Sequence, residues 1–350
     1  MQIVQENSKS LRSIPNWVLE TTSITRLSLR KNNISLVPND IAQLSHLKRL
    51  DLSENQLYSI PAEVGFLTCL EILQLANNHI SSLPRTLGKC FNLQILDVKA
   101  NKITAIPHFF TRLVSLLRLD VSHNALSATK SEFLPAEADG PLDSLWHLTS
   151  LVSLTLDGNN IQRLPANIAQ LTNIERLALA NCGLNALPSH ICALVKMKQL
   201  FLSDNSFVKL PKLFGNMLLL QELDCDDTLV RDLPATMGRC TNLTRLRMTN
   251  CPLNWPLNDL VMQVTRALVV LLTRAAESSP YMKFMYYYFI LAFRSLPKLS
   301  SFSWSERRLK CMRSLWVKCR HCLCRLLPNQ KFSKCTNPLK VYLGSTQTCN

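Results

Sequence analysis

The stretch "LTLDGNNIQRLPANIAQLTNI", from Leu154 to Ile174, spaces leucine, isoleucine, asparagine and proline in a pattern that recurs along the chain. The pattern returns every 23 residues, with one longer interval in the middle of the chain. A fixed period of roughly 20–50 residues is typical of solenoids, in which each copy buries its apolar face against its neighbours. The copies begin at Ile24, Leu47, Leu70, Leu93, Leu116, Leu151, Ile174, Met197, Leu220 and Leu243.

Three columns of the repeat keep their residue type in most copies. The leucine column contains Leu27, Leu50, Leu73, Leu96, Leu119, Leu154, Leu177, Leu200, Leu223 and Leu246. The asparagine column contains Asn32, Asn55, Asn78, Asn101, Asn124, Asn159 and Asn205, with Cys182, Thr228 and Cys251 as substitutes. The proline column contains Pro38, Pro61, Pro84, Pro107, Pro165, Pro188, Pro211 and Pro234.

Each column has a physical reason. The segment LxxLxL alternates, so it predicts a short strand whose leucines face inward. The asparagine amide offers donors and an acceptor to backbone groups in a tight bend. The proline fixes an extended turn on the far side. A repeat of this length leaves little room for a long helix, so we expect extended or 3₁₀ segments there.

This is the leucine-rich-repeat pattern, and it covers roughly residues 8–257. Its variant in Leu164–Leu171, "LPANIAQL", resembles intracellular leucine-rich-repeat proteins of the Ras-pathway scaffold, plant Ras-group-related and Scribble-like families. The resemblance implies an α/β solenoid, a horseshoe with short parallel strands on its concave face. It also implies a non-catalytic scaffold or adaptor in intracellular signal transduction, with protein partners such as a small GTPase or a phosphatase.

The chain is expected to contain four segments: an N-terminal cap with a partial repeat (1–23), a solenoid of about ten repeats (24–257), a helical, apolar C-terminal cap (258–297) and a basic, Cys-rich tail (298–350). The fifth repeat carries an insertion near 127–140. Such an insertion fits a functional loop or a tolerated extension equally well.

The composition argues against an enzyme. The seven histidines share no cluster, and we find no nucleophile motif, Gly-rich phosphate loop or metalloprotease motif. We therefore expect no catalysis, no cofactor and no metal. The 13 cysteines lack the paired flanking arrangement of extracellular repeats, and the mostly polar first ten residues contain no apolar run of the kind a secretory signal has. These features predict free thiols in a reducing, cytoplasmic compartment.

The residues between the leucines of each strand should point to the concave face. We predict that a protein partner contacts this face at Arg26, Arg30, Arg49, Asp51, Ile72, Ile95, Asp97, Arg118, Asp120, Arg176, Phe201, Glu222, Asp224, Asp226, Arg245 and Arg247. The face is expected to be basic at the first repeats and acidic at the ninth, which would orient a partner.

Spacing along the strands also predicts ion pairs on this face. Arg49 should pair with Asp51, and Arg118 with Asp120, while Asp97 reaches Arg118 diagonally. The adjacent carboxylates of Asp97 and Asp120 resemble an acid/base or metal pair. Their expected neutralisation by Arg118 favours a structural interpretation.

The tail contains the chain's main excess of charge. Residues from Lys298 onward hold 11 Lys and Arg against one acid, Glu306, within a chain of net charge +15. Apolar residues at helical spacing in 305–327 make this a basic amphipathic candidate. Three interpretations stay open: a poorly packed tail, contact with an anionic membrane or acidic partner, or zinc binding by the cysteines of 319–324. We recognise no nucleic-acid-binding module, so no nucleic acid is expected.

The alternatives to a scaffold are therefore a peripheral membrane recruiter at the inner face of the plasma membrane and a regulatory subunit of an enzyme. The membrane alternative predicts that the full chain sediments with anionic vesicles and that residues 1–297 do so much less, because the basic tail supplies the attraction. Sedimentation with phosphatidylserine vesicles measures this, with neutral vesicles as the control. Equal sedimentation of both chains would reject the tail as an anchor.

Overall fold

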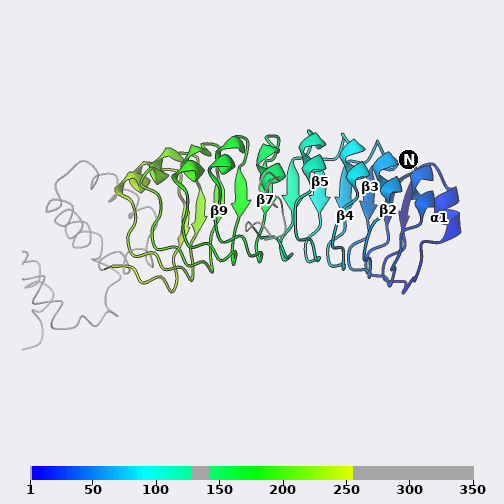
Figure 1. The fold of residues 1–350 in the computed structure, drawn as a ribbon, viewed down its shortest axis with the longest axis horizontal. Coiled ribbons are helices and arrows are strands. Elements are labelled where there is room, and N and C mark those ends of the chain that lie inside the picture. The colour runs from blue at the N-terminus through cyan, green and yellow to red at the C-terminus, as the bar shows by residue number, and fades with distance from the viewer. Residues whose placement is uncertain (1, 128–141, 255–350) are drawn as a thin grey trace, which may run out of the picture. The chain divides into compact units, whose positions relative to one another are not determined.

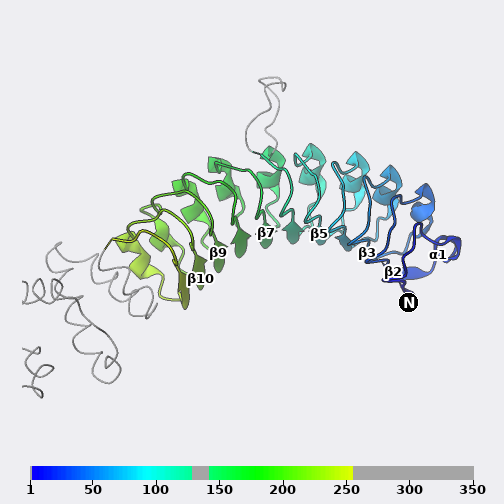
Figure 2. The same cartoon turned by 90° about the horizontal axis from the view of Figure 1, so that it is seen from below.

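The structure is a computed structural model that describes residues 2–127 and 142–254. Most of the insertion predicted at 127–140, and the whole of the predicted cap and tail at 258–350, lie outside the described residues. The described part forms a curved stack of similar chain turns (Figures 1 and 2).

Eleven short strands form one parallel sheet whose spatial order is the order of the sequence. They run side by side along the stack (Figure 1). The strands are β1 Gln2–Gln5, β2 Ile24–Ser28, β3 Arg49–Asp51, β4 Ile72–Gln74, β5 Ile95–Asp97, β6 Arg118–Asp120, β7 Ser153–Thr155, β8 Arg176–Ala178, β9 Gln199–Phe201, β10 Glu222–Asp224 and β11 Arg245–Arg247.

Short 3₁₀ segments lie on the outer side of the curve, opposite the strands (Figure 2), which confirms the expected solenoid fold. The first copy has a short α-helix instead, α1 Asn16–Glu20. The 3₁₀ segments are η1 Asn39–Gln43, η2 Ala62–Phe66, η3 Arg85–Lys89, η4 His108–Arg112, η5 Asp143–His147, η6 Ala166–Gln170, η7 Ser189–Ala193, η8 Phe214–Asn216 and η9 Ala235–Arg239. Most of them follow a proline, whose fixed φ suits the start of a turn.

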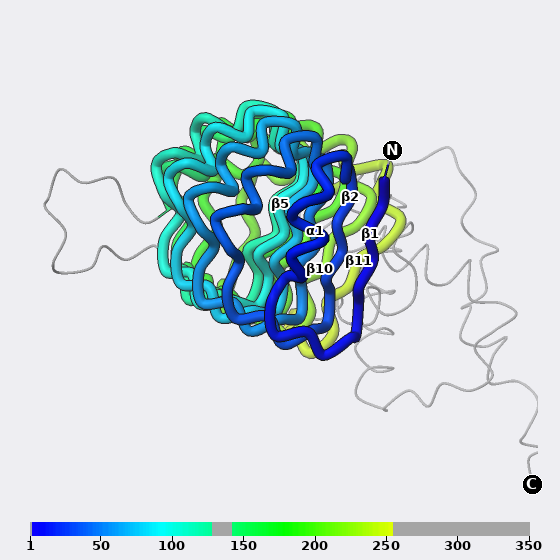
Figure 3. Tube along the Cα trace, turned by 90° about the vertical axis from the view of Figure 1, so that its right-hand side faces the viewer, coloured from blue at the N-terminus to red at the C-terminus, as the bar shows by residue number. Residues whose placement is uncertain are grey.

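The core is a continuous apolar column inside the stacked turns. Figure 3 shows the backbone of these turns end on. Equivalent leucines lie in register on adjacent strands, as Leu50 and Leu73 do, and both are fully buried. Each copy therefore buries its leucines mainly against the copies before and after it, as a quasi-one-dimensional fold requires.

The asparagine column joins each repeat to the preceding one. The Asn55 side-chain amide donates to the carbonyls of Leu29 (2.9 Å) and Leu52 (2.9 Å), and its oxygen accepts from the Ile34 amide (3.1 Å). The same bonds recur at the other asparagines of the column. Each asparagine thus satisfies buried backbone groups in two successive repeats.

The column is weaker in the later repeats. The thiol of Cys182 donates to the Leu156 carbonyl at 3.3 Å. The hydroxyl of Thr228 donates to the carbonyl of Cys225 in its own repeat and lies 3.2 Å from the thiol of Cys251 in the next. Neither side chain has the amide's combination of two donors and an acceptor. The hydrogen bonds therefore show that the later repeats carry imperfect substitutes for asparagine.

The strand β1 was not predicted from the sequence. It pairs in parallel with β2, with Val4 opposite Leu27 in the leucine column. Lys9 stands where an asparagine would complete the pattern, and its own amide donates to Asn32 of the next repeat at 2.9 Å. The backbone of the first copy thus bonds to the asparagine of the second copy. The first copy has no asparagine of its own at this position, so its sequence departs from the repeat pattern.

We predict that Asn78→Ala lowers the free energy of unfolding by about 3 kcal/mol, because it leaves several buried backbone groups without partners. Asn78 bonds to Leu52, Leu75 and Leu57. Urea denaturation followed by circular dichroism measures the change. The control is Asn33→Ala, at an exposed asparagine, which should change stability by less than about 0.5 kcal/mol. Equal effects of the two variants would contradict the role of the column.

Candidate protein-binding face

The side chains between the leucines of β2–β11, together with those directly after each strand, form what we call the concave face. The predicted contact residues all lie on these strands or just after them. Register pairing aligns them in rows that run across the sheet, so that Arg26 lies beside Arg49, and Ile72 beside Ile95. Neighbouring members of a row are about 4.8 Å apart at the backbone.

The first repeats carry the expected basic side chains, but two of them are neutralised. Arg30 forms an ion pair with Glu54, and Lys48 pairs with Glu71 at 2.8 Å. Arg26 and Arg49 are exposed and form no ion pair within the described residues. Arg49 donates to Gln74 on the next strand at 2.6 Å, so the basic surface here is narrower than the sequence predicts.

The prediction of ion pairs along β3 and β6 was wrong. Asp51 accepts from the Ser53 amide at 3.0 Å, and Asp120 accepts from both the amide and the hydroxyl of Ser122. These carboxylates turn toward the backbone two residues ahead, as aspartates commonly do at the end of a strand. Arg118 is exposed, and within the described part of the chain it forms no ion pair.

Asp97 and Asp120 lie side by side on β5 and β6 and are not neutralised as expected. Burial raises the pKa of Asp97, the amide of Lys99 opposes this, and the charge of Asp120 adds to the increase. Burial also raises the pKa of Asp157, just after β7, with a contribution from Asp120, while the Ala180 amide and the charges of His123 and Arg176 oppose the increase. The middle of the concave face therefore holds partly desolvated carboxylates that form no ion pair within the described residues.

The predicted acidic zone at the ninth repeat is internally paired. Glu222 and Asp224 are each only 8% exposed. Arg245 donates to Glu222 at 2.8 Å, and Arg247 lies 3.5 Å from Asp224. Their two arginines are the exposed members of these pairs, so this end of the face is not a negative surface.

Gln199, which was not among the predicted contacts, extends this pairing into a chain of hydrogen bonds. It accepts from Arg176 at 2.8 Å and donates to Glu222 at 3.0 Å, so that β8, β9, β10 and β11 are linked through side chains. The guanidinium of Arg176 also stacks on the Phe201 ring, 4.4 Å from its centroid. In the sequence, a glutamine between an arginine and a glutamate at equivalent positions of successive repeats indicates such a chain of hydrogen bonds.

Burial alone would raise the pKa of Glu222, but the hydrogen bonds from Arg245 and Gln199, with the charges of Arg245 and Arg247, hold it below its ordinary 4.5. A carboxylate whose pKa is lower in the folded chain than in the unfolded chain stabilises the folded state at pH values above its unfolded-state pKa. That contribution is lost as the pH falls through the folded-state pKa.

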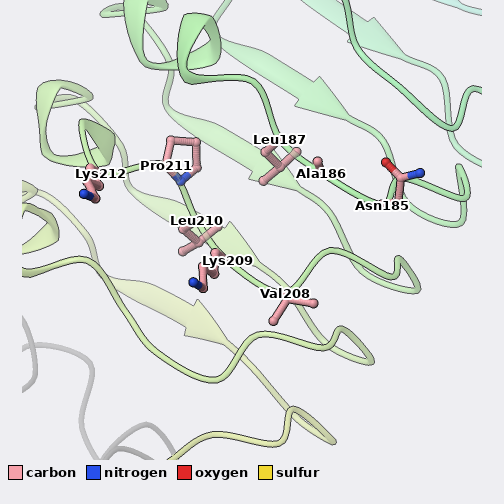
Figure 4. A pocket seen from close by; sticks show the side chains of 8 residues that line it. All are labelled: Asn185, Ala186, Leu187, Val208, Lys209, Leu210, Pro211 and Lys212. Carbon is pink, nitrogen blue, oxygen red and sulfur yellow. The ribbon is translucent and has the colours of Figure 1, made fainter.

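The described part of the chain also has a shallow hollow outside the strands. It lies between the connections that follow β8 and β9 and is lined by Asn185, Ala186, Leu187, Val208, Lys209, Leu210, Pro211 and Lys212 (Figure 4). Its lining is aliphatic apart from one amide and two lysines and contains no carboxylate, hydroxyl, thiol or imidazole. Within 2–127 and 142–254, no three His, Cys, Asp or Glu side chains are grouped as metal ligands would be.

No helix in the described part of the chain is long and apolar enough to cross a membrane. The described cysteines are all free thiols. Burial raises the pKa of Cys90 to about 11 and that of Cys182 to about 12, so these thiols are unreactive.

The stacked strands and the open, polar face define a repeat solenoid of the kind that binds other macromolecules. Comparison with known families agrees with this class. The family described as leucine-rich repeat region matches residues 135–335, and the one described as leucine rich repeat matches residues 22–80 and 68–126. The chain belongs to the leucine-rich-repeat family. No curated protein sequence matches it.

Solved structures show the same fold. The TDR receptor gives a TM-score of 0.63 at 24% identity, over 72% of this chain and 44% of that chain. An internalin, InlF of Listeria monocytogenes, gives a TM-score of 0.55 at 18% identity, over 75% of this chain and 84% of that chain. The plant peptide hormone receptor RGFR1 in complex with RGF2 gives 0.54 at 26% identity, over 72% and 46%. This chain therefore spans less than half the length of the two receptor chains.

We predict that Glu222→Gln lowers the melting temperature at pH 7, and that the difference from the unmodified chain shrinks as the pH falls below 4.5. Thermal melts across the pH range measure both. In a chain that already carries Arg245→Gln, the change Glu222→Gln should alter the melting temperature much less, because the arginine that lowers the pKa of Glu222 is gone. A difference that stays constant from neutral to acid pH would contradict the pairing.

Proposed function

We propose that this protein is a non-catalytic scaffold or adaptor in intracellular signal transduction, and that it holds a protein partner on its concave face. The observation that carries the proposal is the concave face itself: an eleven-stranded sheet whose outward side chains are not needed for the hydrophobic core. A surface of this extent suits a protein better than a small molecule.

Three further observations support the proposal. Ile72, Ile95 and Phe201 are partly exposed among charged residues, as anchor side chains in protein interfaces commonly are. The receptor RGFR1, which has a similar fold, was solved in complex with RGF2. The free thiols favour a reducing, cytoplasmic location.

The resemblance described above favours a small GTPase or a phosphatase as the class of partner. Contact of the segment 305–327 with the inner face of the plasma membrane remains the alternative. That segment lies outside the described residues, so the alternative rests on its sequence.

We predict that Arg26→Glu combined with Arg49→Glu lowers recovery of the bound partner from cells by about tenfold or more, because the reversed charges repel acidic groups of the partner that these two exposed arginines attract. Affinity capture with quantitative mass spectrometry measures the recovery. The matched control is Arg85→Glu combined with Arg112→Glu, which reverses two exposed arginines in η3 and η4 on the outer side. If both double variants retain the same partners, the concave face is not the binding surface.

A further inference from the structure

The concave face divides according to how its charges are satisfied. On β8–β11, the carboxylates of Glu222 and Asp224 are buried under arginines of the next strand. On β5–β7 the opposite holds. Asp97, Asp120 and Asp157 accept only backbone amides or a hydroxyl, and within the described residues none is in an ion pair.

These central carboxylates are close to one another as well as unpaired. Asp97 and Asp120 are register partners, and the charge of Asp120 acts on both Asp97 and Asp157. Partial burial raises the pKa of Asp97 and Asp157. A partner that covered these groups without supplying a positive charge would leave buried negative charges uncompensated, which is costly.

Two aliphatic side chains lie directly beside the carboxylates. Ile72 on β4 and Ile95 on β5 are register partners, and both are partly exposed on a face that is otherwise mostly polar, with the exposed Arg118 on the other side of Ile95. Ile95 and Asp97 are two residues apart on the same strand, so they point to the same side. The site thus offers an apolar surface next to a negative one.

We propose that this central patch, consisting of Ile72, Ile95, Asp97, Asp120 and Asp157, binds a segment of a protein partner that presents an arginine or lysine beside an aliphatic side chain. The proposal rests on the proposed function and specifies the chemistry of the partner. Arginine fits best, since one planar guanidinium donates to two carboxylates at once. Asp97 and Asp120 are register partners on adjacent strands, whose backbones lie about 4.8 Å apart, so one partner side chain can reach both residues.

The charge of the chain makes this proposal easy to test. The net charge is +15, so the molecule as a whole repels a cationic probe and attracts an anionic one. Long-range attraction by the net charge therefore does not favour binding of a basic peptide.

The probe is a fluorescent synthetic peptide that carries two Leu-Gly-Arg motifs, in which leucine and arginine face the same side of an extended chain. Its affinity for the full-length protein is measured by fluorescence anisotropy. We expect Asp97→Asn combined with Asp120→Asn to weaken binding by about tenfold or more. Asparagine keeps an oxygen that accepts the amides of Lys99 and Ser122, so these variants should retain the fold.

The matched control is Asp40→Asn combined with Glu63→Gln. These two acids occupy equivalent positions of adjacent repeats in η1 and η2, on the outer side. Their removal should change the affinity by less than about twofold. Ile95→Ser should weaken binding of the same peptide, because it removes half of the aliphatic surface. Unchanged melting temperatures confirm that each variant is folded.

Two results would overturn the proposal: full affinity of the Asp97/Asp120 variant for the basic peptide, or equal weakening by the outer-side control. Capture from cells then separates this inference from the proposed function. If the Asp97/Asp120 variant recovers the natural partner fully while the Arg26/Arg49 variant does not, the concave face binds a partner of another chemistry. If both recover it fully, the proposed function fails as well.

Discussion

The structure depends on one interaction, the bonding of an asparagine side chain to the backbone of two successive repeats. A chain that turns back on itself within 23 residues leaves backbone groups in a sharp bend that the sheet cannot reach. Asn55 satisfies such groups in its own repeat and in the one before it. Because this bonding requires an alignment of equivalent positions, it stabilises the register of the strands in the repeats that carry the asparagine, and the register in turn fixes the rows of the concave face.

The same bend imposes strain that the hydrogen bonds must offset. The residue just before the asparagine column has a positive φ in repeat after repeat, including Glu54, Ala100 and His123. For residues other than glycine this conformation costs about 1–2 kcal/mol. Glycine occupies the position at Gly158, where a Cβ would meet the His123 ring at 2.5 Å. Residue types at this position vary because the bend is set by the hydrogen bonds around it.

The backbone could be predicted from the sequence much further than the pairing of side chains. The leucine, asparagine and proline columns predict strands, bends and 3₁₀ segments because each has a local physical cause. The partner of Arg49 does not follow from its distance to Asp51, since the carboxylate has a nearer donor in the Ser53 amide. The ion pairs join positions 23 or 24 residues apart, as in Arg245 and Glu222. Comparing positions across the repeats would therefore have predicted them, whereas comparing neighbours along one strand did not.

Side chains connect successive repeats at both ends of the concave face but not in its middle. In the early repeats Arg30 pairs with Glu54 and Lys48 with Glu71, whereas Asp97 and Arg118 form no ion pair within the described residues. In the later repeats Cys182 and Thr228 make fewer backbone bonds. There the side chains of β8–β11 supply connections between repeats instead, through Arg176, Gln199, Glu222 and Arg245. Groups engaged in this way are already paired and must lose those contacts before they bind a partner. The carboxylates of Asp97, Asp120 and Asp157 have no such ion pairs within the described residues, and this favours the middle of the face as the place where a partner binds.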